Sequence, residues 1–357
     1  MRMARTASAA LIAGLVLSGA AFGQAGDPFR KPQPQPGAGD RDTPPLRSKP
    51  QTAPEGQGQL VDLRPKFKKG QELRYVMEVD GKNKIVSKSN EDLNQDQTMS
   101  QRIGLVMRVK EAGDDGATLE VVYESIRVVM DTPDGKAEFD SAKAKKKPDA
   151  SKPKPGQPAG APAGGGNALD DLLAQIIGPM VGTRLEVKTD KNGAITSVTG
   201  GEALSGGAIE GLLGGTAGGP GGMVPSGKSA ANWLTGGIPG SDGRVRIGQT
   251  WTNTDDLGST PAGAFKMVTT HTLKSHAGGL AMVMFNGRAE GAQSESGGPL
   301  GGMIKLKGAG YRGQYQWDTG AGALREMNSE MTTEMTGKIG EDEVTMTGST
   351  TTRVKKQ

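Results

Sequence analysis

The chain has 357 residues, a formal net charge of +4, no Cys and 57 Gly. Without Cys, neither disulfides nor thiol chemistry can contribute. The nearly balanced charge argues against a nucleic-acid partner. Aromatic residues make up only 4 % of the chain, and together with the high Gly content this predicts long unpacked segments beside a modest core.

Residues 1–23 have the layout of a secretory signal peptide. Arg2 and Arg5 form a basic start, the apolar run over 7–17 is too short to span a bilayer, and 21–23 reads small-x-small. An uncleaved anchor is the alternative. Loss of Arg2 and Arg5 leaves 41 of the 43 basic residues against 39 acidic ones, a net charge of +2. We expect an exported, soluble protein of the periplasm or the extracellular space, with no later transmembrane segment.

Three low-complexity tracts divide the rest of the chain. Lys is concentrated in the second tract. We interpret this tract as a solvated linker, and the alternative is that it binds anionic polymers or lipid surfaces. The predicted organisation is a disordered Pro/Gln/Gly-rich arm (24–58), a first β unit (59–141), a Lys/Pro/Gly-rich linker (142–166), a helix with a β-hairpin (167–200), a Gly-rich linker (201–241) and a second β unit (242–357).

Alternating apolar residues predict the strands of the first unit. The phase slips at Glu124-Ser125, which indicates a β-bulge. The stretch "EAGDDGA" (111–117) reads as a hairpin turn. The residues expected on the buried face are Leu73, Tyr75, Met77, Val79, Ile103, Leu105, Met107, Val109, Leu119, Val121, Tyr123, Ile126, Val128 and Met130.

Residues 168–180 carry one apolar stripe and predict a short amphipathic helix, with Asn167 as its cap. A hairpin follows, in which Leu185 and Val187 precede the turn "DKNG". Residues 229–234 are expected to form one more helical turn.

The second unit again reads as strands. Phe265, Met267, Thr269, His271 and Leu273 are expected to share a face, as are the three residues Leu280, Met282 and Met284 that follow. "LREMNSEMTTEM" (324–335) fits a helix or a strand by spacing, and its Thr and Ser content favours a strand. Another face is expected to be shared by Tyr311, Tyr315 and Trp317, and the last strand is expected at Val344, Met346, Thr350, Thr352 and Val354.

Two pairs of short motifs predict an internal duplication with an offset of 178 residues. "KFKKGQEL" (66–73) matches "RVRIGQTW" (244–251), and "GKAEFDS" (135–141) matches "GQYQWDT" (313–319). In each pair the Gly-Gln would open a first strand and the aromatic-Asp would end a later one.

"GMVPSGKS" (222–229) fits the pattern of a phosphate-binding loop. Such a loop needs a buried strand before it. The preceding "GGTAGGPG" cannot form one, and Pro225 lies inside the loop. We therefore expect no nucleotide to bind.

No set of residues predicts catalysis, a cofactor or a metal. His271 and His276 are the only histidines and lack a neighbouring cluster of ligands, so His271 is interpreted as a packed side chain and His276 as a turn residue. Asp114-Asp115 and Asp255-Asp256 read as turns rather than as acid catalysts or calcium ligands. Trp233, Trp251 and Trp317 could form a carbohydrate platform but are more typical of core anchors.

The feature that suggests a ligand-binding function is the high Met content, with 16 Met residues compared with 6 Phe. Met on strand faces makes an adaptable apolar surface, which could line a lipid-sized cavity or simply form a core.

The stretches 66–79, 99–135, 185–200 and 236–251 resemble an uncharacterised family of exported bacterial β proteins, a domain-of-unknown-function family. The resemblance covers most of 59–357 and implies export and a β-rich fold, with no site residue attached. A looser similarity to periplasmic lipoprotein-carrier half-barrels concerns architecture alone.

The sequence therefore predicts a mainly β fold of two related curved antiparallel sheets, as duplicated half-barrel or sandwich-like units, with one short amphipathic helix. The expected function is a non-enzymatic cell-envelope protein that binds an apolar ligand between its sheets. A structural or assembly protein acting through protein–protein contacts and an unrecognised hydrolase are the alternatives.

Overall fold

The computed structural model describes residues 58–133, 135–144, 168–200, 242–260, 263–293, 304–339 and 342–357. The signal peptide, the phosphate-loop pattern, Asn167 and the helical turn at 229–234 lie outside these residues, as do the three low-complexity tracts except for residue 58 and residues 142–144. Residues 142–144 belong to a short helix and not to a linker. The described strands are β1 (Leu60–Asp62), β2 (Glu72–Ser87), β3 (Gln95–Gly113), β4 (Gly116–Thr132), β5 (Gly135–Asp140), β6 (Arg184–Asp190), β7 (Ile195–Thr199), β8 (Arg244–Arg246), β9 (Thr250–Thr260), β10 (Gly263–Ala277), β11 (Leu280–Gln293), β12 (Ile304–Asp318), β13 (Ala323–Ile339) and β14 (Asp342–Lys356).

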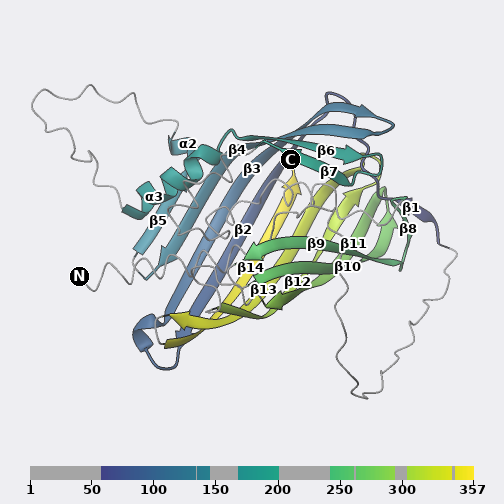
Figure 1. Cartoon of the computed structure of the whole chain (residues 1–357). Helices are drawn as coiled ribbons and strands as arrows, with labels where there is room; N and C mark the ends of the chain where they lie inside the picture. Colours follow the sequence, from purple (N-terminus) through teal and green to yellow (C-terminus); the bar gives the residue numbers. More distant parts are fainter. Residues whose placement is uncertain are drawn as a thin grey trace, which may run out of the picture.

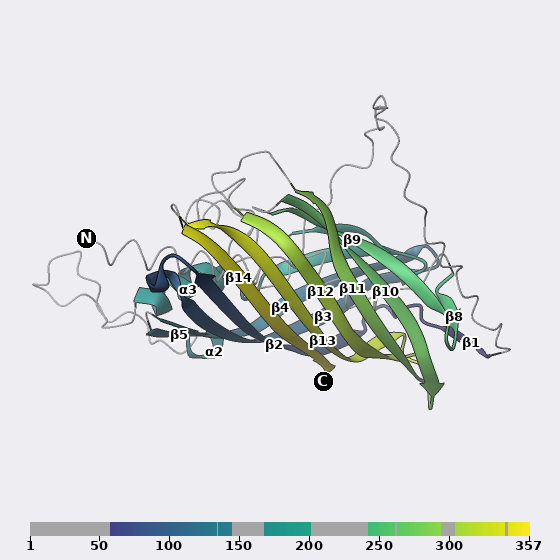
Figure 2. The same cartoon turned by 90° about the horizontal axis from the view of Figure 1, so that it is seen from below.

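The predicted mainly β, antiparallel fold is confirmed. A 12-stranded sheet runs in the order β7-β6-β4-β3-β2-β14-β13-β12-β11-β10-β9. Its twelfth strand, β5, pairs with residues 127–132 of β4, whereas β6 pairs with residues 116–122 of the same strand. The second sheet consists of β1 and β8. The two expected units are thus joined edge to edge, because β14 pairs with β2. The large sheet is twisted and strongly curved (Figures 1 and 2). Among the described strands it stays open, with β7 and β9 at its edges.

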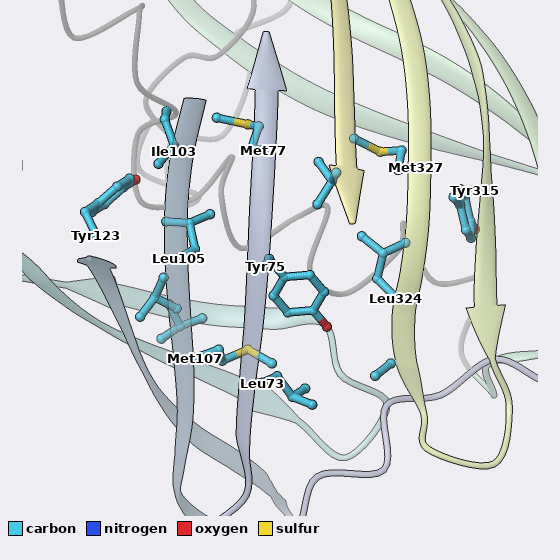
Figure 3. Close-up of a cluster of buried hydrophobic side chains, with 14 of the residues drawn as sticks. Leu73, Tyr75, Met77, Ile103, Leu105, Met107, Tyr123, Tyr315, Leu324 and Met327 are labelled. Carbon is cyan, nitrogen blue, oxygen red and sulfur yellow. The ribbon is translucent and has the colours of Figure 1, made fainter. Parts of the chain in front are cut away.

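One face of the large sheet is buried, and we call it the inner face. Leu73, Tyr75 and Met77 of β2 lie on it, beside the corresponding column of side chains on β3 (Figure 3). The period-two alternation therefore predicted these strands correctly. The bulge at Glu124 is confirmed as well, since Gly104 pairs with Ser125 and Leu105 with Tyr123. "LREMNSEMTTEM" lies in β13, as its composition favoured.

The expected amphipathic helix is α3 (Ala168–Ile177), continued by the 3-10 turn η2 (Gly178–Met180). It buries Leu173 and Ile177 against the core. Asp170 accepts a hydrogen bond from the backbone N–H of Glu138 (2.7 Å), which fixes the helix beside β5. Two shorter helical turns are α2 (Ser141–Ala144) and η1 (Glu91–Leu93). The helix and the β1–β8 sheet lie at opposite ends of the molecule (Figures 1 and 2).

Leu280, Met282 and Met284 share a face of β11 as predicted, but it is the outer face of the sheet. Ala281, Val283 and Phe285 are the buried residues of this strand, whereas Met284 is 46 % exposed. The cause is a bulge at Lys274, because Leu273 pairs with Val283 but Ser275 pairs with Met282. The extra residue shifts the phase between the two arms of the hairpin. The same hairpin places His276 within β10 and not in a turn.

The two Gly-Gln motifs adopt the same geometry. Gly70 donates its N–H to the carbonyl of Val109, and Gln71 accepts from the N–H of Val109. In the second unit Gly248 and Gln249 make the same two bonds with Leu273. Both glycines have a positive φ, of 80° and 85°. This position therefore requires a conformation that favours glycine.

The second pair of motifs is not equivalent in space. Phe139 of β5 pairs with Val128, whereas Trp317 pairs with Ala281 beside the β10–β11 turn. The strand that occupies the place of β12 is β6, since Asp190 and Asp318 end the two strands opposite Gly116 and Leu280. The match between 135–141 and 313–319 was therefore a coincidence of sequence.

Candidate functional site

Five rings gather on the inner face of β9 to β12. Trp251 stacks on His271 with 5.3 Å between ring centroids, and Phe285 and Tyr315 lie 5.7 and 6.2 Å from the same imidazole. Tyr311 completes the group at 4.9 Å from Phe285. We call these five residues the aromatic cluster. The strands set its geometry, because His271 pairs with both Trp251 and Phe285.

A glycine makes room for the cluster. Gly313 of β12 pairs with Phe285. A Cβ at Gly313 would lie 2.6 Å from the Phe285 ring and 2.3 Å from the backbone oxygen of Asn328. No side chain fits there, so the phenyl ring covers the space above the glycine backbone.

His271 is the basic group of the cluster and is only 7 % exposed. Burial lowers the pKa of its imidazole to about 4, so the ring is neutral at pH 7. Its Nδ1 atom has no hydrogen-bond partner among the described residues. Buried nitrogen atoms of this kind are normally paired.

The phenol of Tyr315 and the indole Nε1 of Trp317 are also buried and have no partner within the described ranges. Burial raises the pKa of the Tyr315 hydroxyl, which therefore stays protonated and can donate. The remaining buried side-chain atoms without a partner on the described residues are Tyr75 Oη, Gln95 Oε1, Gln101 Oε1 and Thr333 Oγ1.

Methionines extend the inner face beyond the cluster. Met331 of β13 pairs with Tyr311 on one side and Thr350 on the other. Two strands further, Met99 of β3 pairs with Met130 of β4. The buried methionines are Met77, Met99, Met107, Met130, Met180, Met267, Met327, Met331, Met335 and Met346. The sheet thus presents an apolar and deformable surface on this side.

The opposite, outer face carries the charges. Arg108 bridges Glu72 and Glu120 across three strands, at 2.9 and 3.4 Å, and Arg312 pairs with Glu330 at 2.6 Å. Burial acts to raise the pKa of Glu120, but Lys110, Arg108 and Arg184 outweigh it, so the pKa lies below its ordinary value. Ion pairs of this kind indicate a solvated face.

The other residues considered from sequence do not assemble into a site. Asp114 and Asp115 form the predicted β3–β4 turn, and His276 lies 3.1 Å from the Thr319 hydroxyl. Within the described ranges, no three His, Asp or Glu side chains are close enough to hold a metal. The prediction of a turn at Asp255-Asp256 was wrong, because both residues lie within β9 and pair with Met267 and Lys266 of β10. Their side chains and the whole of Trp233 lie outside the described set. The aromatic cluster was not predicted, because only the strand register reveals it.

No protein-family model matches the chain, and no curated protein matches it. A solved structure on lipid–protein interactions in lipovitellin aligns with a TM-score of 0.38 and 11 % identity, over 82 % of this chain and 25 % of the other. This chain therefore spans about a quarter of the lipovitellin chain. An outer membrane channel from Pseudomonas putida F1 aligns with a TM-score of 0.23 and 6 % identity, over 82 % of this chain and 98 % of the channel.

OccK5 (OpdH) of Pseudomonas aeruginosa gives a TM-score of 0.22 and 9 % identity, over 80 % of this chain and 98 % of that one. At TM-scores this low, the likenesses carry no argument about what this chain binds. Of the helices in the described part of the chain, none has the length and hydropathy to cross a bilayer.

Proposed function

We propose that this chain is an exported, non-enzymatic protein of the cell envelope that binds an apolar ligand on the inner face of its large sheet. The observation that carries the proposal is the contrast between the two faces. Methionines and aromatic rings extend across the inner face from β10 to β4, while the arginine–glutamate pairs lie on the outer one. An adaptable apolar surface suits alkyl chains of variable shape.

Export is part of this proposal and rests on the N-terminal sequence. The basic start, short apolar run and small-x-small motif of residues 1–23 are those of a secretory signal. A structural protein acting through protein–protein contacts is the second candidate, favoured by the long Pro-, Lys- and Gly-rich tracts of the sequence.

The test is a pair of Met→Gln substitutions on opposite faces. Met331→Gln puts an amide on the inner face, whereas Met284→Gln changes a methionine that is 46 % exposed on the outer face. Binding of the apolar fluorescent probe N-phenyl-1-naphthylamine to the purified mature protein is measured by titration. We expect Met331→Gln to weaken binding about fivefold or more, because a polar group then meets the alkyl or aryl surface.

Met284→Gln should bind like the parent protein, and thermal unfolding confirms that both variants fold. Equal binding by folded forms of both variants would contradict a ligand site on the inner face. Absence of binding by the parent protein would favour the structural role.

A further inference from the structure

The strand registers allow the two units to be compared position by position. The Gly-Gln turns align β2 with β9, and a bulge one residue after Val109 and Leu273 aligns β3 with β10. A second bulge recurs where β6 meets β7 and β12 meets β13, at Thr196 and Arg325. From these anchors the equivalent pairs at the aromatic cluster are Leu73 and Trp251, Met107 and His271, Val121 and Phe285, Leu185 and Gly313, and Val187 and Tyr315.

At these five positions the first unit therefore has no aromatic or imidazole ring, but Leu73, Met107, Val121, Leu185 and Val187. The pair Val121 and Leu185 of the first unit corresponds to Phe285 and Gly313 of the second. The larger side chain on one strand thus compensates for the missing side chain on its neighbour. Packing alone explains that exchange. It does not explain His271, because Met serves at the equivalent position and leaves no polar atom without a partner.

Nor does packing explain the Tyr315 hydroxyl, where Val187 serves in the first unit. Both His271 Nδ1 and the Tyr315 hydroxyl are buried, at 7 % and 4 % exposure of their residues, and neither has a partner in the part of the chain that the structure describes. Orphaned buried polar atoms destabilise a protein. A bound molecule that pairs with them would remove this penalty.

We propose that the aromatic cluster binds the uncharged polar group, a hydroxyl or carbonyl, of an amphipathic ligand whose alkyl part lies along the methionines of the inner face. His271 Nδ1 and the Tyr315 hydroxyl are the hydrogen-bonding atoms, and Trp251 and Phe285 are the flanking walls. This inference rests on the proposed function and adds the chemical class of its ligand.

The charge distribution favours a neutral ligand over an anionic one. The described residues on the inner face beside the cluster are uncharged, including Asn253, which pairs with Thr269. Arg312 and Arg288 pair with Glu330 and Glu290 on the outer face. The His271 imidazole is itself neutral at pH 7. A buried carboxylate would have no cation to pair with there, which is strongly unfavourable.

The test uses three probes with the same chain length and different head groups. Octadecanol, octadecene and stearate are each titrated into the mature protein at pH 7.4, with native mass spectrometry as the readout. We expect octadecanol to bind about fivefold more tightly than octadecene, as one to two neutral hydrogen bonds give, and stearate to bind more weakly than octadecanol.

His271→Met and Tyr315→Phe then test the assignment of atoms. Each should reduce the preference for octadecanol over octadecene while octadecene binding is kept, and Met107→Leu at the equivalent position of the first unit should change nothing. Tyr315→Phe removes a single oxygen, so it remains informative if His271→Met folds poorly. An unchanged preference in both variants, or tightest binding of stearate, would overturn this inference and leave the proposed function standing. If none of the probes binds, the proposed function itself fails.

Discussion

His271 shows how an ionisable side chain is controlled by packing. Rings on β9, β11 and β12 surround the imidazole, and burial lowers its pKa to about 4. In the unfolded chain the pKa would be about 6.5. The folded state therefore binds fewer protons than the unfolded state at any pH between these two values.

Stability should consequently fall as the pH drops from about 6.5 towards 4. From the two pKa values, we expect the free energy of unfolding to be about 2 kcal/mol lower at pH 5 than at pH 7.5. Urea unfolding of the parent protein and of His271→Met at both pH values measures this change in the free energy of unfolding. The Met variant should lack this share of the pH dependence. An equal pH dependence in the two proteins would mean that His271 does not titrate in this range.

The inward position of His271 followed from the sequence, since it falls on the apolar phase of its strand. Its neighbours did not follow, because the pairing of β11 with β10 depends on the bulge at Lys274 and the pairing of β9 with β10 on a register shift between Phe265 and Lys266. Periodicity fixes which side of a strand is buried, but it does not fix which residue lies opposite. For the same reason the sequence did not show that Met284 lies on the outer face.

At the scale of the elements, the turns and bulges carry the evidence for an internal duplication. Gly70-Gln71 and Gly248-Gln249 hold the same hydrogen bonds to the neighbouring strand. The Asp carboxylates at the ends of β6 and β12 also act alike, because Asp190 accepts from Asn192 N–H and Asp318 accepts from Gly320 N–H. We propose that the five strands β2, β3, β4, β6 and β7 and the five strands β9 to β13 are two copies of one unit.

This proposal predicts equal effects of the same substitution in the two units. Gly70→Ala and Gly248→Ala should each destabilise the protein by about 1 kcal/mol, because both glycines have a positive φ and open space around the Cβ position. Gly113→Ala is the control, since that glycine also has open space but no positive φ. Urea unfolding gives the three values. A loss at only one of the two turns would count against equivalent units.

Sequence comparison found the first motif because a positive φ restricts the residue to Gly. The second motif, at 135–141 and 313–319, gave a false match, because an aromatic residue followed by Asp ends strands of many kinds. The equivalence of β6 and β12 is hidden by the insertion between β5 and β6, which changes the offset between the units.

On the scale of the whole molecule, β14 joins the two units into one curved sheet with a charged outer face and an apolar inner face (Figures 1 and 2). The strand pattern predicted the β fold and the short helix. It did not predict a single sheet, because the pairing of β14 with β2 connects the end of the described chain to its beginning. Long-range pairing of this kind leaves no local signal in sequence.

Native mass spectrometry of the mature protein, purified from an exported preparation, tests the central claim most directly. We expect a bound mass in the range of a lipid that disappears after organic extraction and returns when octadecanol is added. A bare mass before extraction, with no uptake of octadecanol, would contradict an apolar ligand on the inner face and favour a structural role.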